Sequence, residues 1–161
     1  MGLLSIYLLF KPLDIKQQEF VDVPLFELKD FTMYELDTNS LRTIMVGSAA
    51  TRYSDRYTVK DMDYTDNSKV YVANMQADNG LYKEEFVTLD GNVVYTREDG
   101  LTFKTKKATY NKKTSDVVSD VGFIAYLNSN VVTGSYIKYN NLTKKIYSKD
   151  VAATYQLQER K

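Results

Sequence analysis

The sequence has 161 residues, the size of one ordinary domain, and its 43% hydrophobic and 26% charged residues are typical of a globular protein. It contains no Cys and no His, which excludes disulfide frameworks, thiol nucleophiles, zinc fingers and Ser-His-Asp triads within this chain. Because the commonest general base is absent, the composition disfavours an enzyme. We therefore expect no catalytic residue, no cofactor and no metal site.

The net charge of zero conceals two oppositely charged parts. Residues 1–100 carry 10 basic and 17 acidic residues, whereas residues 101–161 carry 11 basic and 4 acidic residues. Solvated turns and strand edges would account for the lysines of the second part. Alternatively, that part faces an anionic ligand or an acidic partner. Nucleic acid is not an expected partner, because the total charge is zero and no binding motif is present.

The chain opens with an uncharged, mostly apolar segment at residues 2–10. As a helix this segment would span about 14 Å, which is short of the ~30 Å core of a bilayer. We interpret residues 1–12 as the remnant of an N-terminal membrane anchor and residues 13–22 as a polar linker. Residues 23–161 then form the folded domain. A buried first strand or helix is the alternative for the apolar segment.

From residue 23 onward, apolar residues alternate with period two, as half-buried strands require, and no stretch has a helical pattern. Turn signals between the apolar runs predict an antiparallel β structure. The predicted turns are Asp78-Asn79-Gly80, Asp90-Gly91-Asn92, Asp99-Gly100 and Tyr139-Asn140-Asn141. The alternating sets are Val87, Leu89, Gly91, Val93, Tyr95; Val117, Val121, Phe123, Ala125, Leu127; and Val151, Ala153, Tyr155, Leu157.

A weak internal repeat supports this prediction. The repeat places Tyr53, Tyr82, Tyr110 and Tyr139 at successive separations of 29, 28 and 29 residues, each followed by a polar turn segment. Strand, turn and return strand therefore recur about four times. Stacked hairpins of similar length favour an elongated β structure over a compact irregular one.

These strand–turn units resemble the OstA-like β-jellyroll family of lipopolysaccharide-transport proteins, whose members include LptC and LptA. The resemblance covers residues 23–157. It is carried by the units at residues 77–93, 108–121 and 134–149 and by the opening segment at residues 26–31. The resemblance implies an elongated, twisted, open β-jellyroll of antiparallel strands. The apolar start followed by one domain is closest to the LptC pattern within the family.

The family resemblance also implies a function without chemistry. Such a protein accepts lipopolysaccharide from the inner-membrane LptB/LptF/LptG ABC transporter. It then passes the lipid through an apolar groove to an LptA-type periplasmic bridge protein, joined by edge-strand addition, for delivery to the outer membrane. The expected location is the periplasm, with a single N-terminal anchor in the inner membrane.

Three sets of residues are candidates for these roles. The candidate groove residues are Leu89, Val93, Tyr95, Phe103, Val117, Val121, Phe123 and Ala125. The candidate partner edge strand contains Val151, Ala153, Tyr155 and Leu157. The candidate phosphate or partner contacts are Lys144, Lys145 and Lys149. For each apolar position, ordinary sandwich core is the simpler interpretation.

Other functions remain as alternatives. A carbohydrate-binding jelly-roll module would use tyrosine faces, although the chain lacks Trp, and a periplasmic scaffold would assemble without carrying lipid. The carboxylate pairs Asp61/Asp63, Glu84/Glu85 and Glu98/Asp99 fall mostly in predicted turns, where acidic residues are usually solvated. The Asp61, Asp63, Asp66 spacing lacks the Gly and Glu of a calcium loop. Asn141-Leu142-Thr143 is better explained as a turn than as a glycosylation site.

Overall fold

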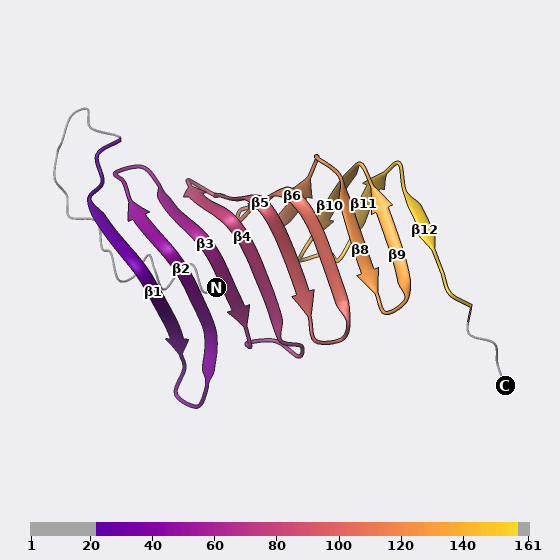
Figure 1. The fold of residues 1–161 in the computed structure, drawn as a ribbon, viewed down its shortest axis with the longest axis horizontal. Helices are drawn as coiled ribbons and strands as arrows, with labels where there is room; N and C mark the ends of the chain where they lie inside the picture. The colour runs from indigo at the N-terminus through magenta and orange to yellow at the C-terminus, as the bar shows by residue number, and fades with distance from the viewer. Residues whose placement is uncertain (1–21, 158–161) are drawn as a thin grey trace.

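The computed structural model describes residues 22–157, and every regular element in that range is a β-strand. The strands form one antiparallel, open sheet (Figure 1), which confirms the predicted all-β fold. The predicted anchor, residues 1–12, and all of the predicted linker except Asp22 lie outside the described residues. Between residues 22 and 157, no helix has the length and hydrophobicity that crossing a membrane requires.

Six long strands come first along the chain, and six short strands follow. The long strands are β1 (Phe26–Leu36), β2 (Leu41–Arg52), β3 (Tyr57–Asp66), β4 (Ala73–Lys83), β5 (Phe86–Arg97) and β6 (Leu101–Asn111). The short strands are β7 (Asp116–Ser119), β8 (Phe123–Leu127), β9 (Asn130–Gly134), β10 (Tyr136–Asn140), β11 (Ile146–Lys149) and β12 (Ala152–Thr154).

The sheet divides into two branches after β6. Residues 101–105 of β6 pair with β8, and residues 109–111 pair with β7. One branch continues as β8, β9 and β12, and the other as β7, β10 and β11. We call the branch of β8, β9 and β12 layer A, together with the halves of β1–β6 that lie in line with it. We call the branch of β7, β10 and β11 layer B, together with the other halves of β1–β6. Consecutive short strands, namely β7 and β8, β9 and β10, and β11 and β12, thus each correspond to one long strand that is interrupted between the layers.

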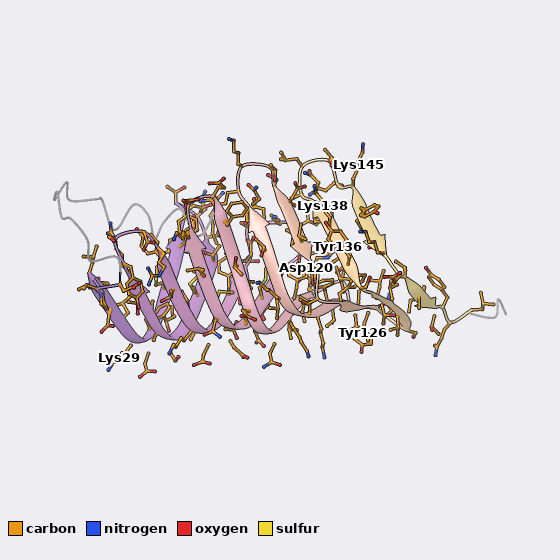
Figure 2. The ribbon with its side chains drawn as sticks, turned by 90° about the horizontal axis from the view of Figure 1, so that it is seen from above. Lys29, Asp120, Tyr126, Tyr136, Lys138 and Lys145 are labelled. Carbon is orange, nitrogen blue, oxygen red and sulfur yellow. The ribbon has the colours of Figure 1, made fainter. Side chains whose placement is uncertain are left out.

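On alternate strands, the line between the two layers is marked by a residue with a left-handed backbone conformation. These residues recur about every 30 positions. They are Asp30 (φ 46°), Asp61 (φ 50°), Gly91 (φ 79°), Gly122 (φ 85°) and Asp150 (φ 52°). Gly adopts this conformation without strain, and Asp tolerates it better than most residues. Figure 2 shows the resulting curve of the sheet, with Lys29 projecting from its convex side.

Two predicted turns are wrong for this reason. Asp78-Asn79-Gly80 lies inside β4, and Asp90-Gly91-Asn92 lies inside β5, where the register of the strand pair shifts. The Asn92 side-chain amide donates to the Asp78 carboxylate at 2.8 Å and so links the two bends. These residues bend a strand and do not reverse the chain. The predicted Asp99-Gly100 turn is confirmed, because it joins β5 to β6.

The core lies on the concave side of this bend. Val93 is 2% exposed and packs with Leu89, Ala77 and Ala108, so both layers contribute to the cluster. Two buried hydroxyls satisfy each other beside this cluster, since Thr105 Oγ1 and Ser119 Oγ are 2.7 Å apart. Farther from the bend, most inward side chains are only half-buried.

Gly91→Ala is expected to lower the free energy of unfolding by about 1–2 kcal/mol. Its φ of 79° disfavours an L side chain, and a Cβ there would lie 2.8 Å from the Asp78 Cβ. Gly80→Ala is the control, because the atoms nearest to a Cβ added at Gly80 lie 3.6 Å away and the φ of Gly80 is ordinary. Urea denaturation of both variants would measure the difference. An equal loss in the two variants would contradict the role of Gly91 in the bend.

Candidate functional site

The concave inner face of the sheet carries a continuous row of uncharged side chains across layer A. Successive strand registers place these residues opposite one another on one face, so we call them the central row. The central row runs from β1 to β12 and consists of Met33, Met45, Tyr64, Met75, Tyr95, Phe103, Ala125, Val132 and Ala153. Most of its members are half-buried, although their side chains point inward.

Seven of the eight candidate groove residues lie on this inner face. Tyr95, Phe103 and Ala125 belong to the central row, and Phe103 stacks on Phe123 with ring centroids 5.5 Å apart. Leu89, Val93 and Val117 also point inward, which their registers with inward residues of β6 establish. Their lipid-binding role remains a prediction, but the structure brings the seven together.

Val121 is the exception among the candidate groove residues. It lies in the break between β7 and β8, beside Gly122, and is 49% exposed. The sequence pattern predicts one strand through Val117, Val121 and Phe123, whereas the structure interrupts that strand at the bend between layers. Period-two alternation therefore does not continue through this position.

The methionines of the inner face were not singled out by sequence reasoning. Met33, Met45 and Met75 belong to the central row, and Met62 packs against the buried core cluster. They lie one on each of four strands, so alternation within a single strand does not group them. Methionine is flexible and polarisable, so it adapts to contacts of irregular shape.

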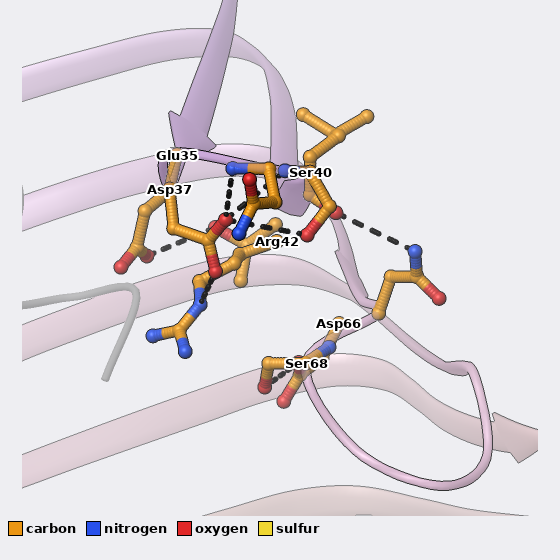
Figure 3. A network of polar contacts seen from close by, with 10 residues as sticks. Glu35, Asp37, Ser40, Arg42, Asp66 and Ser68 are labelled. Atoms are coloured by element: carbon orange, nitrogen blue, oxygen red, sulfur yellow. Dashed lines mark hydrogen bonds and ion pairs between the residues drawn. The ribbon is translucent and has the colours of Figure 1, made fainter.

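The turns at the edge of layer A away from the bend are acidic, and several of their charged side chains pair with one another. We call the β1–β2, β3–β4, β5–β6 and β8–β9 turns rim A. The Asp37 carboxylate accepts hydrogen bonds from the backbone N–H of Asn39 at 2.8 Å and from Arg42 Nε at 2.9 Å (Figure 3). At the β5–β6 turn, Arg97 donates two hydrogen bonds of 2.7 Å to the Asp99 carboxylate. The positive charge of Arg97 is thus neutralised locally.

The corresponding edge of layer B is rich in tyrosine. We call the β2–β3, β4–β5, β6–β7 and β10–β11 turns rim B. Strand registers align an inward row beside it, the rim B row: Arg52, Tyr57, Tyr82, Val87, Tyr110, Val117, Tyr139 and Ile146. Three tyrosines of the sequence repeat belong to this row. Tyr53 does not, because it lies in the β2–β3 turn and Tyr57 occupies the equivalent place.

The two layers face each other across the inner space. Burial raises the pKa of Tyr95 in layer A, an effect that the positive charge of Arg97 opposes. Rim A and rim B bound the inner face on its two sides.

The candidate lysines are separated by the fold. Lys144 and Lys145 lie in the β10–β11 turn of rim B. Lys149 lies at the other end of β11, next to the bend, and its Nζ is 5.3 Å from the centroid of the outward Tyr136 ring. The three lysines therefore do not form one cluster, and only two of them border the inner face.

The candidate edge strand is shorter than its alternating pattern. Only Ala153 of the four residues lies within β12, and its register with Val132 places it at the end of the central row. Val151 precedes β12, whereas Tyr155 and Leu157 follow it. Among the described strands, β12 pairs with β9 alone, so its other edge is unpaired.

The acidic residues do not converge into a site. Asp61 accepts a hydrogen bond from Ser48 Oγ at the bend, and Asp63 accepts one from the Asn74 side chain. Asp66 accepts one from the Ser68 backbone N–H in the β3–β4 turn. Within residues 22–157, no three His, Cys, Asp or Glu side chains are grouped so that they could hold a metal ion.

Acidification is expected to destabilise the fold through four aspartates. The pKa values of Asp37, Asp55, Asp99 and Asp116 are lowered from the ordinary value of an aspartate, and for Asp116 the main cause is the hydrogen bond from the Asn140 side chain. A folded-state pKa below the unfolded value stabilises the fold above the unfolded pKa, and this stabilisation is lost as the pH falls through the folded value. Unfolding in urea should therefore become easier below about pH 4.

Asp116→Asn tests this expectation at one site. The variant should unfold more readily than the native chain near neutral pH and should show a smaller loss on acidification. Asp120→Asn is the control, because it removes an exposed aspartate of the same region. Urea midpoints measured at about pH 6 and about pH 3 would give the comparison. The same pH dependence in native and Asp116→Asn chains would contradict the assignment.

The model of the family described as lipopolysaccharide-assembly, LptC-related matches residues 3–156. Among solved structures, the fold is similar to that of LptH, the LptA-homologous periplasmic component of the lipopolysaccharide transport device of Pseudomonas aeruginosa. The TM-score is 0.53 at 14% sequence identity, covering 85% of this chain and 98% of LptH. No curated protein matches the chain.

Proposed function

The chain belongs to the lipopolysaccharide-assembly, LptC-related family and takes part in lipopolysaccharide transport, and from this premise we propose a specific step for it. It accepts lipopolysaccharide from the inner-membrane LptB/LptF/LptG ABC transporter and passes it along the inner face to an LptA-type bridge protein. The domain works in the periplasm, and residues 1–12 belong to its anchor in the inner membrane. The chain itself performs no chemistry.

The central row is the observation that carries this proposal. It gives acyl chains an uncharged path across layer A from β1 to Ala153 on β12. Each buried CH₂ contributes about 0.8 kcal/mol, so a multi-chain lipid in a closed pocket would be held too tightly to move on. Half-buried residues such as Tyr95 and Phe103 offer partial burial instead, which permits both binding and release.

Hand-over between proteins would use the sheet edges. Within the described range, β1 pairs with β2 alone and β12 with β9 alone, so both ends of layer A have unpaired edges. A partner strand added to β12 would gain main-chain hydrogen bonds and would extend the central row beyond Ala153. Val151, Tyr155 and Leu157 flank that edge, and we assign contact with lipid phosphates to Lys144 and Lys145 in the β10–β11 turn.

Photocrosslinking at neighbouring inward and outward positions tests the proposal. A crosslinking amino acid at Tyr95 or Ala125 faces inward, whereas one at Val94 or Ile124 faces outward on the same strands. With the ABC transporter in proteoliposomes, we expect ATP-dependent lipopolysaccharide adducts at the inward positions only. Adducts at neither inward position, or equally at inward and outward positions, would reject the proposal.

The same experiment separates the alternatives. A scaffold that carries no lipid would give no adduct at any of these positions. A sugar-binding module would need a flat platform of exposed tyrosines, but the exposed tyrosines of the described residues are spread along the sheet: Tyr34 on β1, Tyr71 in the β3–β4 turn, Tyr147 on β11 and Tyr155 after β12. The arrangement of exposed tyrosines therefore favours transport over sugar recognition.

A further inference from the structure

We infer that the inner face binds its lipid in one orientation, with the phosphorylated sugar head over rim B and away from rim A. This inference rests on the proposed function and adds to it the side on which the anionic head lies. It depends on a difference between the two rims that the lipid-transport proposal itself does not require. The difference lies in residue type and in net charge.

The rim B row combines apolar rings with hydroxyl groups. Tyr57 and Tyr82 lie side by side with ring centroids 5.9 Å apart, and Tyr110 and Tyr139 continue the row toward β10. A tyrosine presents an apolar ring to acyl chains and a hydrogen-bonding hydroxyl to a wet surface. Such side chains suit the boundary between the acyl chains of a lipid and its sugar head.

Cations accompany these tyrosines. Lys112 Nζ lies 3.3 Å from the Tyr82 hydroxyl oxygen and 4.8 Å from the centroid of its ring. At the N-terminal end of the row, the Arg52 guanidinium lies 5.5 Å from the centroid of Tyr57. A phosphate over Tyr82 would meet an ammonium group and a hydroxyl, both of which donate hydrogen bonds to an anion.

Rim A presents the opposite chemistry at the equivalent position. Its inward row contains Glu35, Thr43, Asp66, Ala73 and Arg97, which face one another in register. The Glu35 carboxylate accepts a hydrogen bond of 3.2 Å from Thr43 Oγ1, and the Arg97 charge is already held by Asp99. A phosphate placed here would be repelled by carboxylates and would find Arg97 occupied.

The consequence is a directional path. Acyl chains over the central row would lie between a rim that attracts the head and a rim that repels it. A lipid that slid along the row would keep its head on the rim B side from β2 to β10. Each molecule would then leave the chain in the orientation in which it entered.

Binding of lipid A with and without its phosphates to the full chain tests this inference. Lys112→Gln is expected to weaken binding of diphosphoryl lipid A about fivefold and to leave binding of dephosphorylated lipid A unchanged. Tyr82→Phe, which removes only the hydroxyl, should act in the same direction with a smaller effect. Lys69→Gln removes one positive charge from the β3–β4 turn of rim A and should change neither affinity.

Equal weakening by Lys112→Gln and Lys69→Gln would overturn the inference, because it would indicate a general charge effect. Weakening of both lipids by Lys112→Gln would also overturn it, because the lysine would then act through packing and not through phosphate. A native chain that binds both lipids, with no effect of Lys112→Gln or Tyr82→Phe, rejects the rim assignment alone. A native chain that binds neither lipid rejects the proposed function as well.

Discussion

Replacement of Val93 with aspartate is expected to lower the free energy of unfolding by about 3–5 kcal/mol, a large part of the stability of an ordinary domain. Val93 is 2% exposed and packs in the cluster that joins the two layers at the bend. A carboxylate there would lose its hydration and would meet Leu89, Ala77 and Ala108, none of which offers a hydrogen-bond donor from its side chain. The hydroxyl of Thr105, opposite Val93 on β6, already donates to the Gly122 carbonyl oxygen. The damage would therefore reach both layers.

Val94→Asp is the matched control for this prediction. Val94 is the next residue on β5 and points outward, where its partner across the strand pair is Lys104. An aspartate at position 94 would stay hydrated and would face an opposite charge, so we expect a change within about 0.5 kcal/mol. Urea denaturation followed by circular dichroism measures both variants. Similar losses in the two would show that the sheet does not alternate as described around the Gly91 bend.

The sequence suffices to predict the fold class because alternation and hairpin spacing are local properties of the chain. Val87, Leu89, Val93 and Tyr95 follow period two within one strand, and the structure places all four on the inner face. Three tyrosines of the repeat mark equivalent places in successive hairpins. Stacked hairpins of similar length leave few arrangements other than a long antiparallel sheet.

The bend could not be predicted in the same way. Asp90-Gly91-Asn92 favours left-handed backbone conformations, which serve a hairpin turn and a strand bend equally well. Which of the two forms depends on whether residues 93–97 pair with the preceding part of β5 or continue along β4 and β6. That choice is made by strand partners distant in the sequence, so the local pattern does not distinguish the two bends from turns or show that the strand breaks at Val121.

The candidate site was predicted in part for a related reason. Alternation identifies inward residues such as Tyr95 and Ala125, but it does not show which inward residues lie beside the bend and which remain half-exposed. Rim A and rim B exist only after the sheet folds, because each combines turns from distant parts of the chain. The charge difference along the sequence therefore did not reveal the difference between the two rims.

Ala125→Arg is expected to reduce lipopolysaccharide adducts at Tyr95 about tenfold in the proteoliposome assay. Ala125 has a small side chain and lies in the central row between Phe103 and Val132. A guanidinium in the path of the acyl chains would either lose its hydration or keep water in the apolar row. Both outcomes raise the free energy of the bound lipid and interrupt its path to Ala153.

Thr133→Arg adds the same side chain on the outer face of the adjacent strand, since Thr133 faces the outward Ile124. It should leave the adducts at Tyr95 unchanged, and circular dichroism with urea denaturation would establish that both arginine variants are folded. If Ala125→Arg is folded and still yields native amounts of adduct, the central row is not the path of the acyl chains. If both variants lose adducts equally, the loss reflects added positive charge on layer A and not an obstruction of the inner face.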